Sequence, residues 1–338
     1  MTKTQPLTLS KILGNFFVLF VLCIISFIYY TFVTEFYPRR EELGISILLG
    51  VFHLMVFLLL WSFFMAMLTD PGMVPPLWGF YMGDSEQKRR RYCLMCHVFK
   101  PERCHHCSAC NRCVLNMDHH CPWINNCVGF YNRKFFLLLL VYVLLSAYTV
   151  AVSMAKPTYD KIFYFIQSRD LFAYKQIISI GGYGLDLMLS VVLSLFFKFH
   201  LKLLFRNSTT IENMDKKTQQ RQNTYDKGPK SNWEQVFGRN PWLWFLPMHG
   251  ASGKPIGDGV IWNQEQVYNY EEEVPANEGE SRRTSRVTGS GIVGSREIKS
   301  SRDLFAVSPR STNQVDSTRS SAPRSHAPNS ERPAQDNV

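Results

Sequence analysis

The chain has 338 residues and a formal net charge of +10, because 37 lysines and arginines outnumber 27 acidic residues. Hydrophobic residues make up 46% of the sequence and gather into long runs, which favours a membrane protein. A basic chain can indicate nucleic-acid binding, but membrane-spanning runs exclude that class. Much of the positive charge here lies in loops and in an arginine-rich tail.

Four apolar runs are long enough to cross the hydrocarbon core of a bilayer, which needs about 20 helical residues. They cover residues 12–33, 45–67, 135–155 and 177–199. The first run is longer than the apolar part of a signal peptide, and no small-residue cleavage site closes it before Glu35. We therefore expect it to be retained as a membrane-spanning helix.

Eight of the nine cysteines lie between the second and third runs. Most of them belong to two sets of equal spacing, each a C-x2-C pair followed by a histidine and a cysteine. The sets are Cys93, Cys96, His106 and Cys113, then Cys107, Cys110, His120 and Cys127. Three thiolates and one imidazole complete the tetrahedral coordination of a structural Zn²⁺. We expect two interleaved zinc sites here, because histidines at ligand spacing and an expected cytosolic location argue against disulfides.

Cys121 has no chelate partner in this pattern, because Ile124 stands where a second cysteine would be. The pattern also uses His120 as a ligand and leaves His119 free. In an extended segment alternate side chains share a face, so His119 and Cys121 can lie together while His120 points to the metal. A thiol beside a histidine base, with Asp118 orienting the imidazole, is typical of an activated cysteine nucleophile.

Two alternatives concern the cysteines outside the ligand sets. Cys121 could instead be a spare zinc ligand, which would leave the segment a scaffold without chemistry. Cys104 has no partner at chelate spacing either, and we expect it to be a buried or spare thiol. Substitution of Cys121 separates the two interpretations, because only an enzyme depends on its sulfur.

The loops set the expected orientation, because short loops rich in lysine and arginine stay in the cytosol. The first loop carries only Arg39 and Arg40, opposed by three glutamates. The loop with the cysteines is far more basic and carries Lys88, Arg89, Arg90, Arg91, Lys100, Arg103, Arg112, Arg133 and Lys134. We therefore expect the zinc segment and both termini to be cytosolic.

The fourth run contains three glycines and Asp186. A carboxylate inside a membrane is costly and usually faces the interior of a helix bundle. Two interpretations remain open: Asp186 lies within the span and faces the interior, or the span begins after it and Asp186 lies at the membrane surface.

The sequence thus predicts an all-α polytopic membrane protein with four transmembrane helices, a cytosolic cysteine-rich double-zinc domain between helices 2 and 3, and a disordered C-terminal tail. The predicted parts are residues 1–69, an N-terminal cytosolic segment with helices 1 and 2; 70–134, the cysteine-rich domain; 135–199, helices 3 and 4; 200–269, a cytosolic lobe at the membrane surface; and 270–338, the Ser/Arg-rich tail.

Several motifs resemble the DHHC family of protein S-acyltransferases, also called palmitoyltransferases. The strongest is Asp118-His119-His120-Cys121 within the cysteine pattern, between helices 2 and 3 of a four-helix membrane protein. Three further segments are similar to the DPG motif, the TTxE motif and the C-terminal element of that family. They are Asp70-Pro71-Gly72, then Thr209-Thr210-Ile211-Glu212, and the stretch with Asn223-Thr224-Tyr225, Asn232-Trp233 and Val236-Phe237-Gly238. The resemblance covers roughly residues 10–245 and leaves out the tail.

The resemblance implies a two-step reaction. Cys121 would take a long-chain acyl group, such as palmitoyl, from acyl-CoA and pass it to cysteines of substrate proteins at the cytosolic membrane face. His119 would be the base, Asp118 would orient it, and both Zn²⁺ ions would be structural. Expected partners are acyl-CoA and substrate proteins with cytosolic juxtamembrane cysteines, in the endoplasmic reticulum, Golgi or plasma membrane. No residue is assigned to the coenzyme.

Two other classes of protein share parts of this pattern. A membrane-anchored ubiquitin ligase has interleaved zinc sites but different ligand spacing, and it needs no unligated cysteine beside a free histidine. A membrane-anchored zinc-binding scaffold, or an inactive relative, remains the alternative. The C-terminal Asp336-Asn337-Val338 resembles a ligand of a PDZ-type carboxylate-binding domain.

Overall fold

The computed structural model describes residues 9–79, 91–168, 174–215, 223–250 and 252–262, all within one compact unit. The predicted tail, with its PDZ-type terminus, lies outside the described residues, and so do Lys88, Arg89 and Arg90.

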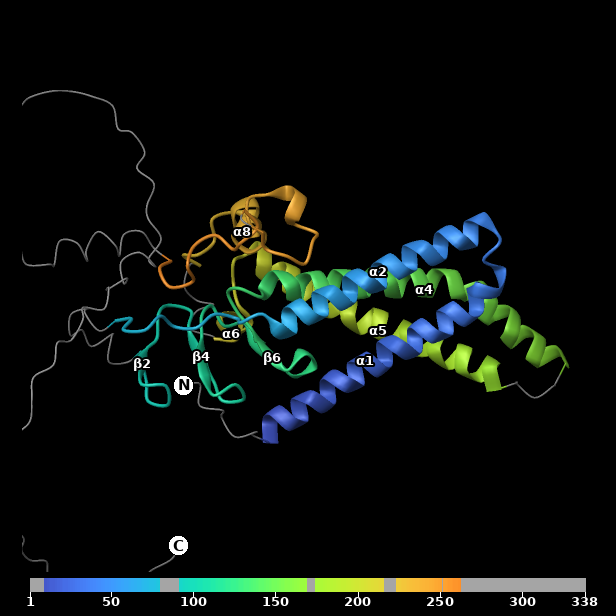
Figure 1. Ribbon diagram of the computed structural model, residues 1–338, viewed down its shortest axis with the longest axis horizontal. Coiled ribbons are helices and arrows are strands. Elements are labelled where there is room, and N and C mark those ends of the chain that lie inside the picture. The colour runs from blue at the N-terminus through green and yellow to red at the C-terminus, as the bar shows by residue number, and fades with distance from the viewer. Residues whose placement is uncertain (1–8, 80–90, 169–173, 216–222, 251, 263–338) are drawn as a thin grey trace, which may run out of the picture. The chain divides into compact units, whose positions relative to one another are not determined.

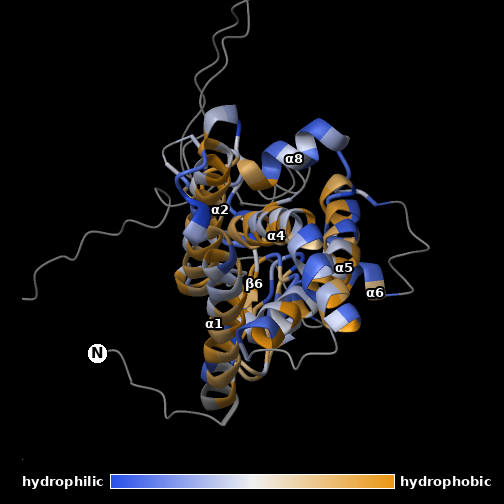
Figure 2. Ribbon diagram, turned by 90° about the vertical axis from the view of Figure 1, so that its right-hand side faces the viewer, coloured by the Kyte–Doolittle hydropathy of each residue, from blue (hydrophilic) through white to orange (hydrophobic). Residues whose placement is uncertain are grey.

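Four long helices dominate the described chain: α1 (Leu9–Phe36), α2 (Leu43–Leu68), α4 (Arg133–Ser168) and α5 (Tyr174–Phe205). Each is long and apolar enough to cross a membrane, so the four predicted spans are confirmed. The last two helices extend beyond the predicted apolar runs, because apolar composition marks the part suited to lipid and a helix can continue into polar sequence. Figure 2 shows apolar residues along these helices and hydrophilic ones on α8 (Pro229–Phe237).

The four helices pack around three apolar clusters, each of which contains residues of both α2 and α4. At the end near the 3₁₀ turn η1 (Tyr37–Arg39), Phe32 of α1 meets Phe52 of α2 with ring centroids 4.0 Å apart. The approach of α1 to α5 is close, because a Cβ at Gly182 would lie 2.6 Å from the side chain of Thr31. Toward the other end, α1 diverges from α2 (Figure 1). A pocket at this end is lined by residues of α1 and α2, such as Leu22 and Met67, and by Asn125 of the cysteine-rich segment.

The cysteine-rich segment forms three short antiparallel hairpins rather than one sheet. Strands β1 (Tyr92–Cys93) and β2 (Val98–Phe99) make the first, and β3 (His105–Cys107) and β4 (Arg112–Val114) make the second. The third pairs β5 (His119–Cys121) with β6 (Asn126–Val128) through the 3₁₀ turn η2 (Pro122–Ile124). With so few strand residues, the hairpins need metal sites to hold them, since metal affinity becomes folding energy.

The segment after α5 returns to α4. It contains α6 (Thr210–Met214), α8 and the 3₁₀ turn η3 (Pro241–Leu243). Lys134 of α4 is 1% exposed and donates 2.7 Å hydrogen bonds to the carbonyls of Leu243 and Met248. A buried cation therefore anchors this segment, which agrees with a lobe after the fourth helix. The predicted boundaries at residues 200 and 269 stay a prediction.

Candidate active site and metal centres

The two predicted ligand sets each converge on one point. In each set the four ligand atoms lie within 4.8 Å of one another. The Nδ1 atom of His106 is 3.2 Å from the sulfur of Cys96 and 3.6 Å from that of Cys93. In the second set, His120 Nδ1 is 3.4 Å from Cys110 and 3.7 Å from Cys127. These separations suit the edges of a tetrahedron with zinc–ligand bonds of about 2.0–2.3 Å, so the clusters fit two zinc sites.

The three hairpins share one backbone plan. In the first two, a residue with positive φ follows the C-x2-C pair: His97 (φ 54°) after Cys96, and Asn111 (φ 50°) after Cys110. The third hairpin has Asn125 at φ 47°, but Ile124 replaces the second cysteine. Cys121 thus occupies the position that Cys93 and Cys107 hold in the other two hairpins, but its hairpin has no second cysteine. This agrees with the prediction that Cys121 belongs to neither metal site.

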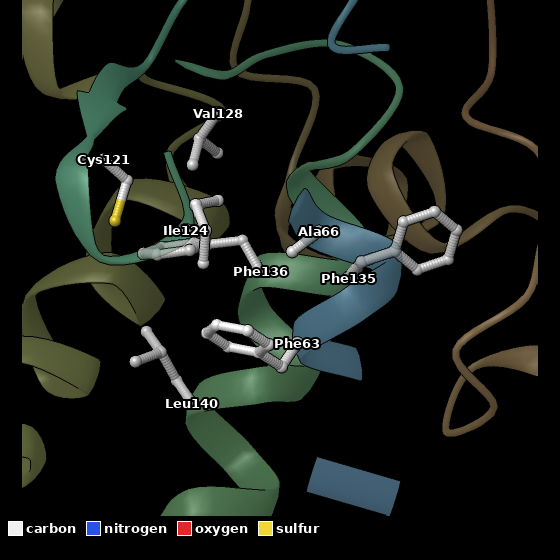
Figure 3. Packing of buried hydrophobic residues seen from close by; sticks show 8 residues of the cluster. All are labelled: Phe63, Ala66, Cys121, Ile124, Val128, Phe135, Phe136 and Leu140. Atoms are coloured by element: carbon white, nitrogen blue, oxygen red, sulfur yellow. The ribbon is translucent and has the colours of Figure 1, made fainter. Parts of the chain in front are cut away.

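Cys121 lies above the apolar end of the helix bundle. Its side chain is 5% exposed and belongs to a cluster with Phe63 of α2, Ile124, and Phe136 and Leu140 of α4 (Figure 3). The other members of the cluster are Ala66, Val128 and Phe135. The thiol therefore sits where polar hairpins meet a hydrocarbon interior.

His119 lies between Asp118 and Cys121. Its Nδ1 donates to Oδ2 of Asp118 at 2.6 Å. Burial alone would lower the pKa of His119, but the hydrogen bonds with Asp118 and with Cys121 raise that pKa to about 9. The structure thus places His119 in contact with both Asp118 and Cys121, and the carboxylate fixes the orientation of the imidazole.

Asp118 is 1% exposed and is fixed from several directions. It accepts two hydrogen bonds from Thr210, and Nη2 of Arg133 lies 3.7 Å from Oδ1. The Nδ1 atom of His200 in α5 is 3.9 Å from Oδ2. Burial alone would raise the pKa of Asp118, but the hydrogen bond from His119 and the charge of Arg133 hold that pKa well below its usual range.

Comparison with known proteins agrees with this site. The sequence matches the DHHC palmitoyltransferase family over residues 86–217. It is 37% identical over 272 residues to probable protein S-acyltransferase 13 of Arabidopsis thaliana, covering 73% of this chain and 89% of that protein. It is 31% identical over 295 residues to human palmitoyltransferase ZDHHC20, covering 74% of this chain and 76% of that protein. The chain belongs to the DHHC palmitoyltransferase family.

Contacts of its two neighbours, Thr209 and Glu212, hold Thr210 of this DHHC protein in place. Thr209 caps α6: its hydroxyl accepts from the Glu212 amide at 3.2 Å, and the Glu212 carboxylate accepts from the Thr209 amide at 2.9 Å. The Arg103 guanidinium donates two hydrogen bonds, of 2.7 and 2.8 Å, to the same carboxylate. The Arg103 guanidinium lies against the rings of both Tyr225 and Trp262, 4.4 Å from each centroid, and these two rings also contact each other edge to face. Thr210 follows directly from this fixed turn.

The second and third hairpins also contact the end of α2. Asp70 accepts from the Gly72 amide at 2.8 Å and pairs with Arg112 of β4 through two bonds of 2.8 Å. Asn126, in the strand opposite Cys121, donates to the carbonyls of Ala66, Met67 and Thr69. The side-chain amide of Asn126 thereby satisfies carbonyls that the end of α2 leaves without helical partners.

Sequence reasoning missed three contributors to this site. In the sequence Arg133 is one of several loop cations, yet it is 3% exposed beside Asp118. His200 is a single histidine in an apolar run, without a spacing signal. Thr210 stands out only as part of the TTxE-like motif. Cys104, as expected, is a buried thiol: it is 1% exposed, and burial raises its pKa to about 12.

Proposed function

We propose that this DHHC protein transfers a long-chain fatty acyl group from acyl-CoA to cysteine thiols of substrate proteins, through an acyl-Cys121 intermediate. Its family membership supports S-acyltransferase activity. The observation that carries the mechanism is the Asp118–His119–Cys121 arrangement above an apolar bundle, with a separate complete ligand set for each zinc. A long-chain acyl thioester suits this environment, because its reactive carbonyl can meet the Cys121 thiol while its hydrocarbon chain enters the apolar bundle.

In the first step His119 takes the proton of the Cys121 thiol, and the thiolate attacks the thioester carbonyl of acyl-CoA. A new carbon–sulfur bond forms, the coenzyme leaves as a thiolate, and His119 returns the proton to it. In the second step a substrate cysteine gives its proton to His119 and attacks the Cys121 thioester. Cys121 leaves, regains the proton, and the enzyme is restored.

Asp118 acts through His119. Its carboxylate accepts the Nδ1 hydrogen at 2.6 Å, so the other ring nitrogen is left to exchange the proton with sulfur. It also stabilises the imidazolium formed when Cys121 ionises. The depressed pKa of Asp118 keeps it charged for this role.

The metal ligands serve structure in this proposal. Cys93, Cys96, His106 and Cys113 would hold one Zn²⁺, and Cys107, Cys110, His120 and Cys127 the other. Bound zinc would supply cross-links among three hairpins, and its complete coordination leaves no position for a catalytic water. Because His120 lies between His119 and Cys121, its attachment to the second site would fix β5.

The remaining assignments follow the membrane arrangement. The cysteine-rich domain and both termini face the cytosol, where its lysines and arginines can attract the coenzyme phosphates. Substrates are proteins whose cysteines lie near the cytosolic membrane surface, in the endoplasmic reticulum, Golgi or plasma membrane. The C-terminal Asp336-Asn337-Val338 provides a ligand for a PDZ-type partner.

Release of coenzyme A from palmitoyl-CoA by the detergent-purified protein tests this function. We expect release by the wild type, none by Cys121→Ser, and a strong reduction in His119→Ala. The zinc content of each variant reports whether its scaffold is intact. A zinc-loaded wild type that releases no coenzyme would favour the scaffold alternative.

A further inference from the structure

The interior of the helix bundle contains one unexplained carboxyl group. Asp186 lies within α5 and is 1% exposed, so of the two interpretations left open by the sequence, the bundle interior is correct. Its Oδ2 has no hydrogen-bond partner among the described residues. Leaving a polar group unpaired in such surroundings is costly, which suggests that a ligand supplies the missing partner.

Asp186 lines a cavity of about 60 Å³, and residues from all four long helices form its wall. Ile28 of α1, Val56 of α2, Val150 of α4 and Leu189 of α5 represent its mainly hydrocarbon wall. Ser146 also lines the cavity, but its hydroxyl already donates to the carbonyl of Val143 at 3.0 Å. The volume admits one small terminal group.

Water alone is a poor occupant of this cavity. A buried water typically makes about three hydrogen bonds and needs two to four polar partners. Oδ2 of Asp186 is the one fully buried side-chain polar atom without a hydrogen-bond partner among the described residues of the lining. A hydrocarbon chain that ends in one hydroxyl satisfies this oxygen and fills the apolar remainder.

The cavity lies deeper in the bundle than the cluster that contains Cys121, because Ser146 and Val150 of its lining follow Leu140 of that cluster along α4. Phe197 of α5 packs against the cluster that contains Cys121. Asp186 precedes Phe197 by 11 positions in the same helix, which corresponds to about 16 Å of rise. An acyl group of palmitoyl length, bound at Cys121 and extended into the bundle, has its last carbons near this depth.

We infer that the cavity binds the distal end of an acyl chain and that Asp186 hydrogen-bonds a hydroxyl carried there. The ligand class is acyl-CoA with a hydroxylated chain end, and Asp186 determines specificity for it. This inference rests on the proposed transfer from acyl-CoA through Cys121. It adds a polar selection site inside the bundle, about 16 Å of helix rise from Phe197.

A competition between two donors tests the inference. Detergent-purified protein receives an equimolar mixture of palmitoyl-CoA and ω-hydroxypalmitoyl-CoA, and mass spectrometry gives the ratio of the two acyl groups on the enzyme. We expect the wild type to favour the hydroxylated chain by about fivefold, the effect of one net hydrogen bond. Asp186→Leu should remove or reverse the preference, and Asp186→Asn should keep part of it.

Two controls separate a specific effect from a general one. Ser190→Ala removes another buried hydroxyl without a partner among the described residues, outside the cavity lining, and should keep the wild-type ratio. A donor hydroxylated beside the thioester should show no advantage over palmitoyl-CoA in the wild type. This second control needs no variant, so misfolding of Asp186→Leu cannot obscure the result.

Equal ratios for wild type and Asp186→Leu, with efficient acylation by palmitoyl-CoA, would overturn the inference and leave the proposed function standing. An equal preference for hydroxyl groups at both chain positions would overturn it as well. Absence of acylation by either donor on folded, zinc-loaded protein would overturn the proposed function, and this inference with it.

Discussion

Thr210 donates two hydrogen bonds to Asp118, from its backbone N–H to Oδ1 at 3.0 Å and from its hydroxyl to Oδ2 at 2.9 Å. The two residues are 92 positions apart in the sequence. The turn after the fourth helix therefore fixes the carboxylate that orients His119. This contact connects the TTxE-like segment, through Asp118, to the proposed catalytic base His119.

Replacement of Thr210 by valine should lower the rate of acyl-enzyme formation by about ten- to a hundredfold. Valine keeps the shape but removes the hydroxyl bond to a charged group, which contributes about 1.5–3 kcal/mol. Thr210→Ser keeps the hydroxyl and should remain close to wild type. Single-turnover acylation at saturating palmitoyl-CoA measures both variants, and equal rates for valine and wild type would contradict the role of this bond.

Glu212→Gln should destabilise the protein by about 3–5 kcal/mol, because it leaves Arg103 as a buried cation without its partner. The Arg103 side chain is 1% exposed and that of Glu212 is 14% exposed. Thermal unfolding in detergent measures the loss. Glu42→Gln is the matched control, since the Arg39–Glu42 pair is exposed on both sides and should contribute little. Similar melting temperatures for both variants would argue against a structural role for the buried pair.

Glu212 should also make the free energy of unfolding depend on pH in the acid range. Burial alone would raise the pKa of Glu212, but the hydrogen bond and charge of Arg103 lower it below its ordinary 4.5. The folded-state pKa is thus below the unfolded one, so the contribution to the unfolding free energy is complete above pH 4.5 and is lost as the pH falls through the lowered folded-state value.

Unfolding midpoints between about pH 6 and pH 3 check this sign. Both proteins should lose stability as zinc ligands protonate, but the wild type should lose more than Glu212→Gln, which lacks the titrating group. Parallel curves for the two proteins would show that Glu212 does not contribute to the acid dependence.

The metal sites and spans were accessible to sequence reasoning because both rest on local patterns. The repeated C-x2-C spacing separated Cys121 from the ligands, and the structure has the same two clusters. Strand alternation placed His119 beside Cys121. Each of these arguments needs only residues a few positions apart and one well-known coordination geometry.

Contacts between distant segments were not accessible in this way. Arg103, Arg133 and Lys134 read as loop cations, yet all three are at most 4% exposed and hold tertiary contacts. A cation that anchors a lipid-facing loop and a cation buried against carbonyls look alike in sequence. Asp186 was ambiguous for a related reason, since hydropathy does not reveal which face of α5 points into the bundle.

Removal of one zinc ligand should release one metal ion. His106→Ala should bind about one zinc per chain and unfold at a lower temperature, because metal binding contributes folding energy. Its neighbour His105 belongs to neither ligand cluster, so His105→Ala should keep both ions. Elemental analysis of purified protein measures the ratio, and full zinc content in His106→Ala would contradict the ligand assignment.

The location of the acyl group after reaction with palmitoyl-CoA tests the central claim most directly. The reacted protein is quenched in acid, digested and mapped by mass spectrometry, with a hydroxylamine-treated half as control. We expect the palmitoyl group on Cys121, bound as a hydroxylamine-labile thioester and absent from Cys121→Ser. A palmitoyl group on Cys23 or Cys104 instead, with Cys121 unmodified while coenzyme A is released, would contradict the account.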